Sequence, residues 1–383
     1  MPMLIAIFKF CDNTILRLLC KLNNKYKNTK IKFIKMRFTR REYKKFNKKS
    51  YNSFILGGDI GGTNCNLGVF GVKNKSSGLL IFFHFNSKDL KNLYSPINEA
   101  LNYIKKNYGV KVIKACLGVA GAVSPKRDYV HLTNAKLDVA VNELLRKTQL
   151  KKVLLMNDFE AVGYGINVLT KNDVKTIKKA AKIPKAPVVV IGAGTGLGKT
   201  LIIYNENKCM YMPIPSEAHH SDFAVQNELE LKLVNFIKKN RKIKNVSNGD
   251  ILSGEGLENI YHFLRQKFKE TKFTKEIDKA KKKPELISKY RKIDKTCKAA
   301  FEIFKTAYAR FAKNMVLDAL ALGGVYIAGG IAPKNKEIFD KEFIKIFEES
   351  NKMGRILKKI PIYLIINHDA GLLGAGFAGS RLL

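Results

Sequence analysis

Hydrophobic residues recur along this chain in short runs that predict strands alternating with helices. Strand-like runs rich in Val, Ile, Leu and Phe lie within residues 53–72, 79–85, 112–121, 151–169, 187–208, 323–335 and 360–380. Helical spacing of apolar positions marks residues 90–108, 225–240, 255–269 and 296–321, whereas 269–295 is Lys-rich and poorly apolar. Strands that alternate with helices predict the α/β class.

Two glycine-rich segments interrupt strand-like runs, GDIGGTN (58–64) and GAGTGLGKT (192–200). The second nearly matches a P-loop, with Ala193 at the first glycine position, but a P-loop must open a helix. Here LIIYNENK follows, which favours a strand, and the first segment likewise leads into CNLGVFGV. The missing helix also excludes a dinucleotide fingerprint. We therefore predict two similar halves, each offering a glycine hairpin to a phosphate chain in a cleft between them.

Composition limits the number of domains, the cellular compartment and the class of partner that can be expected. The chain is long enough for two domains and has no apolar run of 18 residues, so no membrane-spanning helix is expected. Six scattered cysteines without a C-x-x-C pair indicate free thiols in a reducing, cytoplasmic compartment. The net charge of +38 suggests nucleic acid, but the lysines are dispersed and no nucleic-acid-binding signature occurs. A solvated Lys-rich surface is therefore favoured, and no specific nucleic-acid partner is expected.

Residues 1–52 differ from the rest of the chain. They hold fifteen Lys or Arg but only Asp12 and Glu42 as acids. This composition predicts a basic N-terminal extension that is disordered or loosely docked. Apolar positions between Ile15 and Leu22 leave an amphipathic membrane-surface anchor as the less favoured alternative, and Lys9 and Asp12 argue against a secretory signal.

From about residue 54 to the C-terminus the chain resembles the bacterial-type glucokinase family of the sugar kinase, hsp70 and actin superfamily. The resemblance is carried, in order, by GDIGGTN (58–64), NDFEAVGYGI (157–166), GAGTGLG (192–198), E-x-x-H-x-D-F (217–223), LSGEGL (252–257), GGVYIAGGIAP (323–333) and IPIYLI…GLLGAG (360–376). It implies two ribonuclease-H-like (actin-like ATPase) domains around a cleft, expected at 54–168 plus 370–383 and at 169–369. It also implies ATP-dependent, Mg²⁺-assisted phosphorylation of D-glucose to glucose 6-phosphate, feeding glycolysis, and a homodimer as a family-level expectation.

Asp158 is the candidate general base. It follows the apolar run VLLM and precedes a helical pattern, which predicts a position at the C-terminal end of a strand. The resemblance implies that this carboxylate takes the proton of the sugar C6 hydroxyl and that Asn157 holds a sugar hydroxyl. The alternative for Asp158 is a cap for the following helix.

The glycine segments supply the candidate nucleotide site. Asp59 is expected to hold Mg²⁺ through water, because Mg²⁺ keeps several of its waters. The phosphate and nucleotide contacts are expected from Gly58, Asp59, Ile60, Gly61, Gly62, Thr63, Gly194, Thr195, Gly196, Gly329 and Gly330. For Gly329 and Gly330 a plain tight turn is the alternative.

The adjacent histidines of PIPSEAHHSDF (213–223) raise the question of a metal site. With Asp222 as the one further carboxylate nearby and no cysteine, metal binding is disfavoured. The resemblance places Glu217 and His220 on a sugar-binding pair, with a structural hydrogen-bonded pair as the alternative. His219 stands where the family commonly has glycine, and we assign it no role.

Gly249 is a second departure from the family. Here the chain has glycine where the family usually has an acidic residue that binds the sugar. Asp250, or otherwise Glu255, is the candidate replacement. This departure keeps two alternatives open: a kinase for another hexose or an amino sugar, and a non-catalytic sugar-sensing regulator.

Overall fold

The computed structural model describes residues 38–43, 47–132 and 135–383. Its first sheet has six strands in the order β1-β4-β3-β2-β5-β8. The pairs β1–β4, β4–β3 and β3–β2 are antiparallel, and the pairs β2–β5 and β5–β8 are parallel. Their bounds are β1 Thr39–Glu42, β2 Ser53–Ile60, β3 Asn64–Lys73, β4 Ser76–Asn86, β5 Lys114–Val119 and β8 Lys152–Asn157.

The second sheet repeats this plan in the order β12-β11-β10-β13-β14-β9. A hairpin, β10–β11, is followed by the parallel strands β13 and β14, as β2–β3 is followed by β5 and β8. The bounds are β9 Val174–Lys178, β10 Val188–Ala193, β11 Leu197–Asn205, β12 Met210–Ile214, β13 Val325–Ala328 and β14 Ile362–Ile365. A separate ribbon pairs β6 (Tyr129–Leu132) with β7 (Leu137–Ala140). The predicted α/β class and the two similar halves are confirmed, whereas the exact domain boundaries stay predictions.

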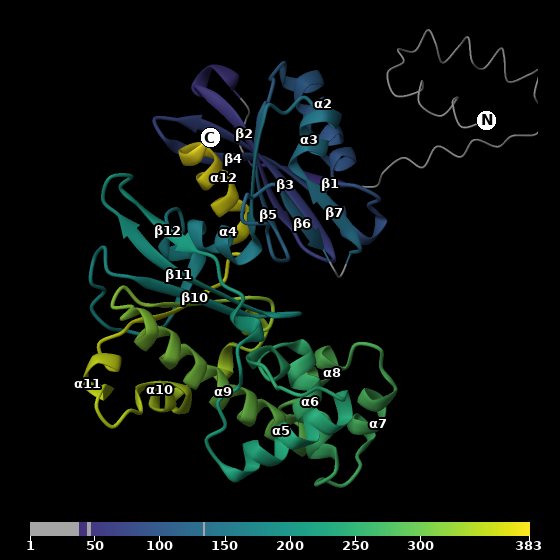
Figure 1. Cartoon of the computed structure of the whole chain (residues 1–383), viewed down its shortest axis with the longest axis vertical. Coiled ribbons are helices and arrows are strands. Elements are labelled where there is room, and N and C mark those ends of the chain that lie inside the picture. The colour runs from purple at the N-terminus through teal and green to yellow at the C-terminus, as the bar shows by residue number, and fades with distance from the viewer. Residues whose placement is uncertain (1–37, 44–46, 133–134) are drawn as a thin grey trace, which may run out of the picture. The chain divides into compact units, whose positions relative to one another are not determined.

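Helices flank both sheets (Figure 1). The α-helices are α2 Tyr94–Tyr108, α3 Val141–Lys147, α4 Asp158–Gly165, α5 Glu228–Arg241, α6 Gly254–Arg265, α7 Lys272–Lys279, α8 Lys283–Tyr290, α9 Lys295–Ala319, α10 Lys341–Glu348, α11 Gly354–Leu357 and α12 Ala370–Leu382. Short 3₁₀ helices are η1 Lys48–Ser50, η2 Ser87–Asp89, η3 Lys171–Asp173, η4 Ala218–His220, η5 Asn248–Asp250, η6 Ala332–Lys334 and η7 Lys336–Ile338.

Helices α4 and α12 connect the two halves (Figure 1). Helix α12 packs on α4 and on strands β2 and β5, and α4 also contacts β10, β11 and β12. The helices approach so closely that a Cβ at Gly374 would lie 1.8 Å from the carbonyl oxygen of Ala161. The Phe159 ring fills the space beside Gly198 on β11. Gly374 is therefore required for the close crossing of α12 and α4.

The core of the second half lies on both faces of its sheet. Val189 and Ile191 of β10 point into a large cluster with helices α5 to α10, while Val188 and Val190 face α4. Successive strand residues point to opposite faces of the sheet, so the apolar strand β10 packs against helices on both faces. This arrangement holds the end of β10, where the second glycine turn begins, between packed layers.

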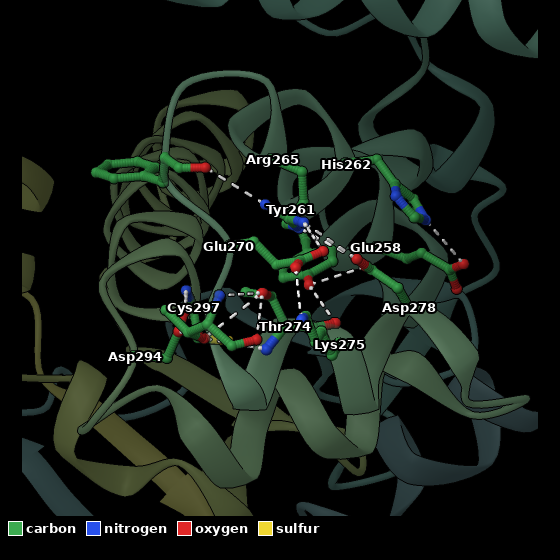
Figure 2. A network of polar contacts seen from close by, with 12 residues as sticks. Glu258, Tyr261, His262, Arg265, Glu270, Thr274, Lys275, Asp278, Asp294 and Cys297 are labelled. Carbon is green, nitrogen blue, oxygen red and sulfur yellow. Dashed lines mark hydrogen bonds and ion pairs between the residues drawn. The ribbon is translucent and has the colours of Figure 1, made fainter.

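Helices α7 and α8 lie in the Lys-rich, poorly apolar segment 269–295, to which the sequence analysis assigned neither helix nor strand. Each buries a single isoleucine, Ile277 or Ile287, so the apolar pattern is too sparse to detect. Polar contacts hold the segment instead (Figure 2). The Tyr261 hydroxyl donates to Asp278 at 3.0 Å, and the Thr271 hydroxyl donates to Asp294 at 2.7 Å.

Strand β1 lies inside the predicted extension 1–52, and the sequence pattern did not reveal it. It forms the edge of the first sheet and pairs with β4, and Phe38 just before it contacts the rings of Phe83 and Phe85. The disordered or loosely docked extension was predicted for residues 1–52 and the membrane-surface anchor for residues 15–22. Residues 1–37, and with them the anchor, lie outside the described residues. No helix in the described part of the chain has the length and apolarity to cross a membrane.

Candidate functional site

Asp158 begins α4 directly after the C-terminal end of β8. The preceding Asn157 caps this helix, because its Oδ1 accepts the Phe159 N–H at 2.8 Å while its Nδ2 donates to the carbonyl of Gly121 at 3.1 Å. Asp158 accepts the same Phe159 N–H at 2.9 Å. Asn157 therefore supplies the cap that was the alternative role for Asp158, and it keeps one further amide proton for a ligand.

The environment of Asp158 makes its carboxylate a stronger base than an ordinary aspartate. Burial raises its pKa, and the negative charge of Glu217 raises it further. The Phe159 N–H acts in the opposite direction without cancelling the rise. A raised pKa favours proton uptake near neutral pH, which suits general-base chemistry.

Asp59 lies beside this base because β2, β5 and β8 are parallel and end at the same edge of the sheet. Burial raises the pKa of Asp59 to about 7, and the carboxylates of Asp158 and Asp369 contribute to the rise. No cationic side chain among the described residues offsets these charges at Asp59. The three acids thus form a concentration of negative charge that favours a cation.

Asp369 is a member of this group that the sequence analysis missed. It lies at the N-terminus of α12, where Gly371 packs against the Asp59 carboxylate, and it accepts a hydrogen bond from the Tyr43 hydroxyl at 3.2 Å. An acid directly before a glycine-rich helix was the available signal. Its proximity to Asp59, more than 300 residues away, is decided by the fold.

The first glycine loop joins β2 to β3 as predicted. The Gly61 N–H donates to the Asn64 carbonyl at 2.8 Å, and the buried Ser87 hydroxyl donates to the Gly61 carbonyl at 2.7 Å. Gly62 is half-buried and Thr63 is exposed. Gly58 and Ile60 are buried in β2, so their predicted contact with phosphate would have to come from their backbone.

The second glycine loop joins β10 to β11 and meets the turn at Gly329 and Gly330. Within the loop, the Gly194 N–H donates to the Gly196 carbonyl at 2.8 Å. Gly329 has φ +82°, and a Cβ there would lie 2.4 Å from the Ala193 carbonyl oxygen. The side-chain position at Gly330 is open. The structure therefore brings the second glycine loop against the turn at Gly329 and Gly330, two segments that were both predicted to contact the nucleotide. Thr195 lies at the tip of the loop.

The segment 217–220 presents exposed polar groups at η4. Both Glu217 and His220 are exposed, and the rings of His219 and His220 lie 4.6 Å apart at an angle of 64°. No group of three metal-ligating side chains occurs in the parts of the chain that the structure describes. The location fits a polar ligand better than a structural metal.

Asp250, the predicted replacement for an acid at position 249, has both carboxylate oxygens engaged. One oxygen accepts from the Ser247 N–H at 2.8 Å and from the Ser247 hydroxyl at 2.7 Å, and the other forms an ion pair with Arg241. Arg241 also binds Glu255 at 2.7 Å. These contacts engage both carboxylate oxygens, and a role for Asp250 as a sugar ligand stays a prediction.

A buried ion pair supports the helix that carries Asp158. Glu160 is buried in α4 and accepts two hydrogen bonds from Arg127, at 2.8 and 3.0 Å. A paired guanidinium and carboxylate hold a fixed relative geometry. This contact limits rotation of α4 and so helps to fix the position of Asp158.

Two sheets of the same topology, each with a glycine hairpin, and an aspartate at the edge where parallel strands end define a sugar kinase of the actin-like ATPase fold. A sequence profile of the glucokinase family matches residues 56–381. The glucokinase of Nostoc sp. (strain PCC 7120 / SAG 25.82 / UTEX 2576) is 33% identical over 347 residues, covering 86% of this chain and 100% of the relative. The chain therefore belongs to the glucokinase family, which confirms the resemblance that its motifs indicated. Members of this family are ATP-dependent hexose kinases.

Solved structures agree on the fold. A glucokinase from an Antarctic psychrotroph superposes with a TM-score of 0.71 at 24% identity, over 85% of this chain and 98% of that chain. The glucokinase from Balamuthia mandrillaris in complex with glucose superposes with a TM-score of 0.69 at 20% identity, over 85% and 93%. At this level of identity the likeness establishes the shared architecture.

Proposed function

We propose that this chain transfers the γ-phosphoryl group of ATP to the C6 hydroxyl of D-glucose, with Asp158 as the general base. The observation that carries the assignment is the position of Asp158 at the strand edge, with its pKa raised by burial and by Glu217. The carboxylate takes the hydroxyl proton while the C6 oxygen bonds to the γ-phosphorus. The bond to the bridging β–γ oxygen breaks, and ADP leaves with that oxygen.

The glycine hairpins hold the phosphate chain in this proposal. Backbone N–H groups at Gly62, Thr63, Thr195 and Gly196 can approach phosphate oxygens, whereas the Gly194 N–H is bound within its own loop and leaves Gly194 to contribute close approach without a side chain. The turn at Gly329 and Gly330 lies against the second hairpin and is assigned to the nucleoside end. Two loops from similar halves would align the γ-phosphoryl group with the sugar hydroxyl.

Asp59 is the residue that fits Mg²⁺. Its carboxylate is influenced by those of Asp158 and Asp369. Burial raises its pKa to about 7, the two neighbouring acids contribute to the rise, and a divalent cation would favour the charged form. The described residues offer no three-ligand cage, which agrees with an ion that retains several waters. When bound, Mg²⁺ would neutralise charge on the phosphates.

The sugar contacts are assigned to Asn157, Glu217 and His220. Asn157 retains an amide donor after capping α4, and the exposed Glu217 and His220 supply an acceptor and a donor. Sugar hydroxyls that lose water need such partners, because an unpaired buried hydroxyl is costly.

The test is sugar-dependent ADP release with Mg-ATP, measured separately for glucose, mannose, fructose and amino sugars. Replacing Asp158 by Asn should lower kcat about 10²–10⁴-fold, the usual contribution of a general base, with an unchanged melting temperature. The matched control is Asp222→Asn, an exposed acid of the 217–223 segment, which should keep kcat within about twofold. Undiminished turnover in Asp158→Asn would refute the base assignment, and turnover with a different sugar alone would change the substrate. If no sugar supports turnover, the result would favour the alternative of a non-catalytic sugar-sensing regulator.

A further inference from the structure

His219 lies between the second glycine hairpin and the 3₁₀ helix η5. Its Nδ1 accepts a hydrogen bond from the Leu197 N–H at 3.0 Å. On the other side, its ring packs against Gly249, where a Cβ would fall 2.2–2.4 Å from Cε1, Nδ1 and Nε2. The imidazole therefore occupies the space that any side chain at position 249 would need.

The hydrogen bond from Leu197 determines the tautomer of this imidazole. A backbone N–H can donate only to an unprotonated nitrogen, so the proton of the neutral ring resides on Nε2. Burial and the neighbouring His220 lower the pKa of His219, which favours the neutral form. Nε2 makes no hydrogen bond with any residue that the structure describes, so a half-buried N–H donor is available.

The polar groups around this donor are otherwise engaged or lie on the sugar segment. Asp250 and Glu255 are both paired with Arg241. Glu217 lies two residues before His219. The ring centroids of His219 and His220 lie 4.6 Å apart. His219 Nε2–H is thus the uncommitted donor beside the residues assigned to the sugar.

We propose that His219 is a specificity-determining residue whose Nε2–H donates to a sugar hydroxyl, in place of the side chain that Gly249 lacks. The inference rests on the proposed sugar kinase activity and deepens it. The site would present a neutral donor on this side of the sugar where an acidic side chain would present an acceptor. A hydroxyl accepts this hydrogen bond without a change of protonation state.

Two amide substitutions separate the roles of the ring nitrogens. The side-chain oxygen of Asn is as many bonds from Cα as Nδ1, so His219→Asn keeps the acceptor for Leu197 and removes the Nε2 donor. The amide nitrogen of Gln corresponds to Nε2, so His219→Gln keeps the donor and removes the acceptor. A role confined to bracing the hairpin predicts the opposite ranking of the two variants.

The experiment measures steady-state kinetics with glucose and with ATP, together with glucose binding by calorimetry. His219→Asn should raise the KM and the Kd for glucose about tenfold, the usual effect of one lost hydrogen bond, with the KM for ATP changed less than twofold. His219→Gln should remain within about threefold of the parent for glucose. Melting temperatures verify that both variants are folded.

The outcomes are distinguishable from failure of the proposed function. Parent-like glucose binding in His219→Asn, or stronger binding by His219→Asn than by His219→Gln, would overturn the inference. Glucose binding without any ADP release would refute the kinase assignment, while the ranking of dissociation constants would still decide the role of His219. Absence of binding by every sugar tested would refute both. Glucose affinity should fall when His219 is protonated, because a proton on Nδ1 displaces the hydrogen bond from the Leu197 N–H that positions the ring. The titratable groups that face His219 are His220, Asp250, Glu217 and Glu255.

Discussion

Replacing Gly249 by Ala tests whether the His219 ring fills the side-chain space at this position. The new Cβ would lie 2.2 Å from Cε1 of the ring and 2.4 Å from both nitrogens, whereas ordinary contacts begin near 3.4 Å. The ring must therefore withdraw by about 1 Å. It cannot do so and keep its 3.0 Å hydrogen bond with the Leu197 N–H.

The cost follows from three contributions. Overpacking of a filled site costs about 1–3 kcal/mol, and the weakened hydrogen bond costs about 1 kcal/mol. The loss of chain entropy in the unfolded state returns about 0.4–1 kcal/mol, because Gly249 does not have a positive φ. We expect a net loss of about 2 kcal/mol in the free energy of unfolding and a melting temperature lower by roughly 4 °C.

The assay is a double-mutant cycle of Gly249→Ala and His219→Ala, followed by thermal unfolding of all four proteins. Without the imidazole, Gly249→Ala should be neutral or stabilising by about 0.4–1 kcal/mol, so the coupling should reach about 2–3 kcal/mol. If Gly249→Ala lowers the melting temperature equally in both backgrounds, the ring does not occupy this space and the reasoning is wrong.

Three further outcomes are expected. Replacing Glu217 by Gln removes a charge that raises the pKa of Asp158, the proposed general base, so the acid limb of kcat/KM for glucose should move to lower pH. Replacing Arg310 by Ala leaves the buried Glu230 carboxylate unpaired and should cost about 3–5 kcal/mol in unfolding free energy, measured by urea titration. Removal of residues 1–52 should give a lower melting temperature than removal of residues 1–37, because only the longer deletion removes β1 and its pairing with β4.

Each of these has a control. Asp222→Asn, which removes an exposed carboxylate, should leave the acid limb in place, and an unmoved limb in Glu217→Gln would contradict the electrostatic argument. Lys185→Ala disrupts the exposed pair with Glu206 and should leave the free energy of unfolding nearly unchanged, because solvent screens this pair. An equal cost for both ion-pair variants would contradict the role of burial. Equal stability of the two truncated chains would show that β1 contributes nothing.

The sequence determined those parts of the molecule in which local chemistry dictates the structure. Apolar runs marked most strands, and the strand-like residues after each glycine turn correctly predicted hairpins in place of P-loop helices. Asp158 after an apolar strand was placed correctly at the strand edge. In contrast, β1, α7 and α8 escaped detection. Backbone pairing with β4 holds β1, the Thr271 cap begins α7, and α8 buries only Ile287 and Tyr290.

Tertiary structure alone decided which distant side chains meet. Asp250 and His219 both lie in segments that the sequence marked for sugar binding, yet the first is bound by Arg241 and the second fills the space at Gly249. Asp369 reaches Asp59 because α12 begins at the edge where β2 ends. Hydrophobic periodicity specifies which face of an element is buried, but the neighbours of a polar group depend on how close packing places one element against another.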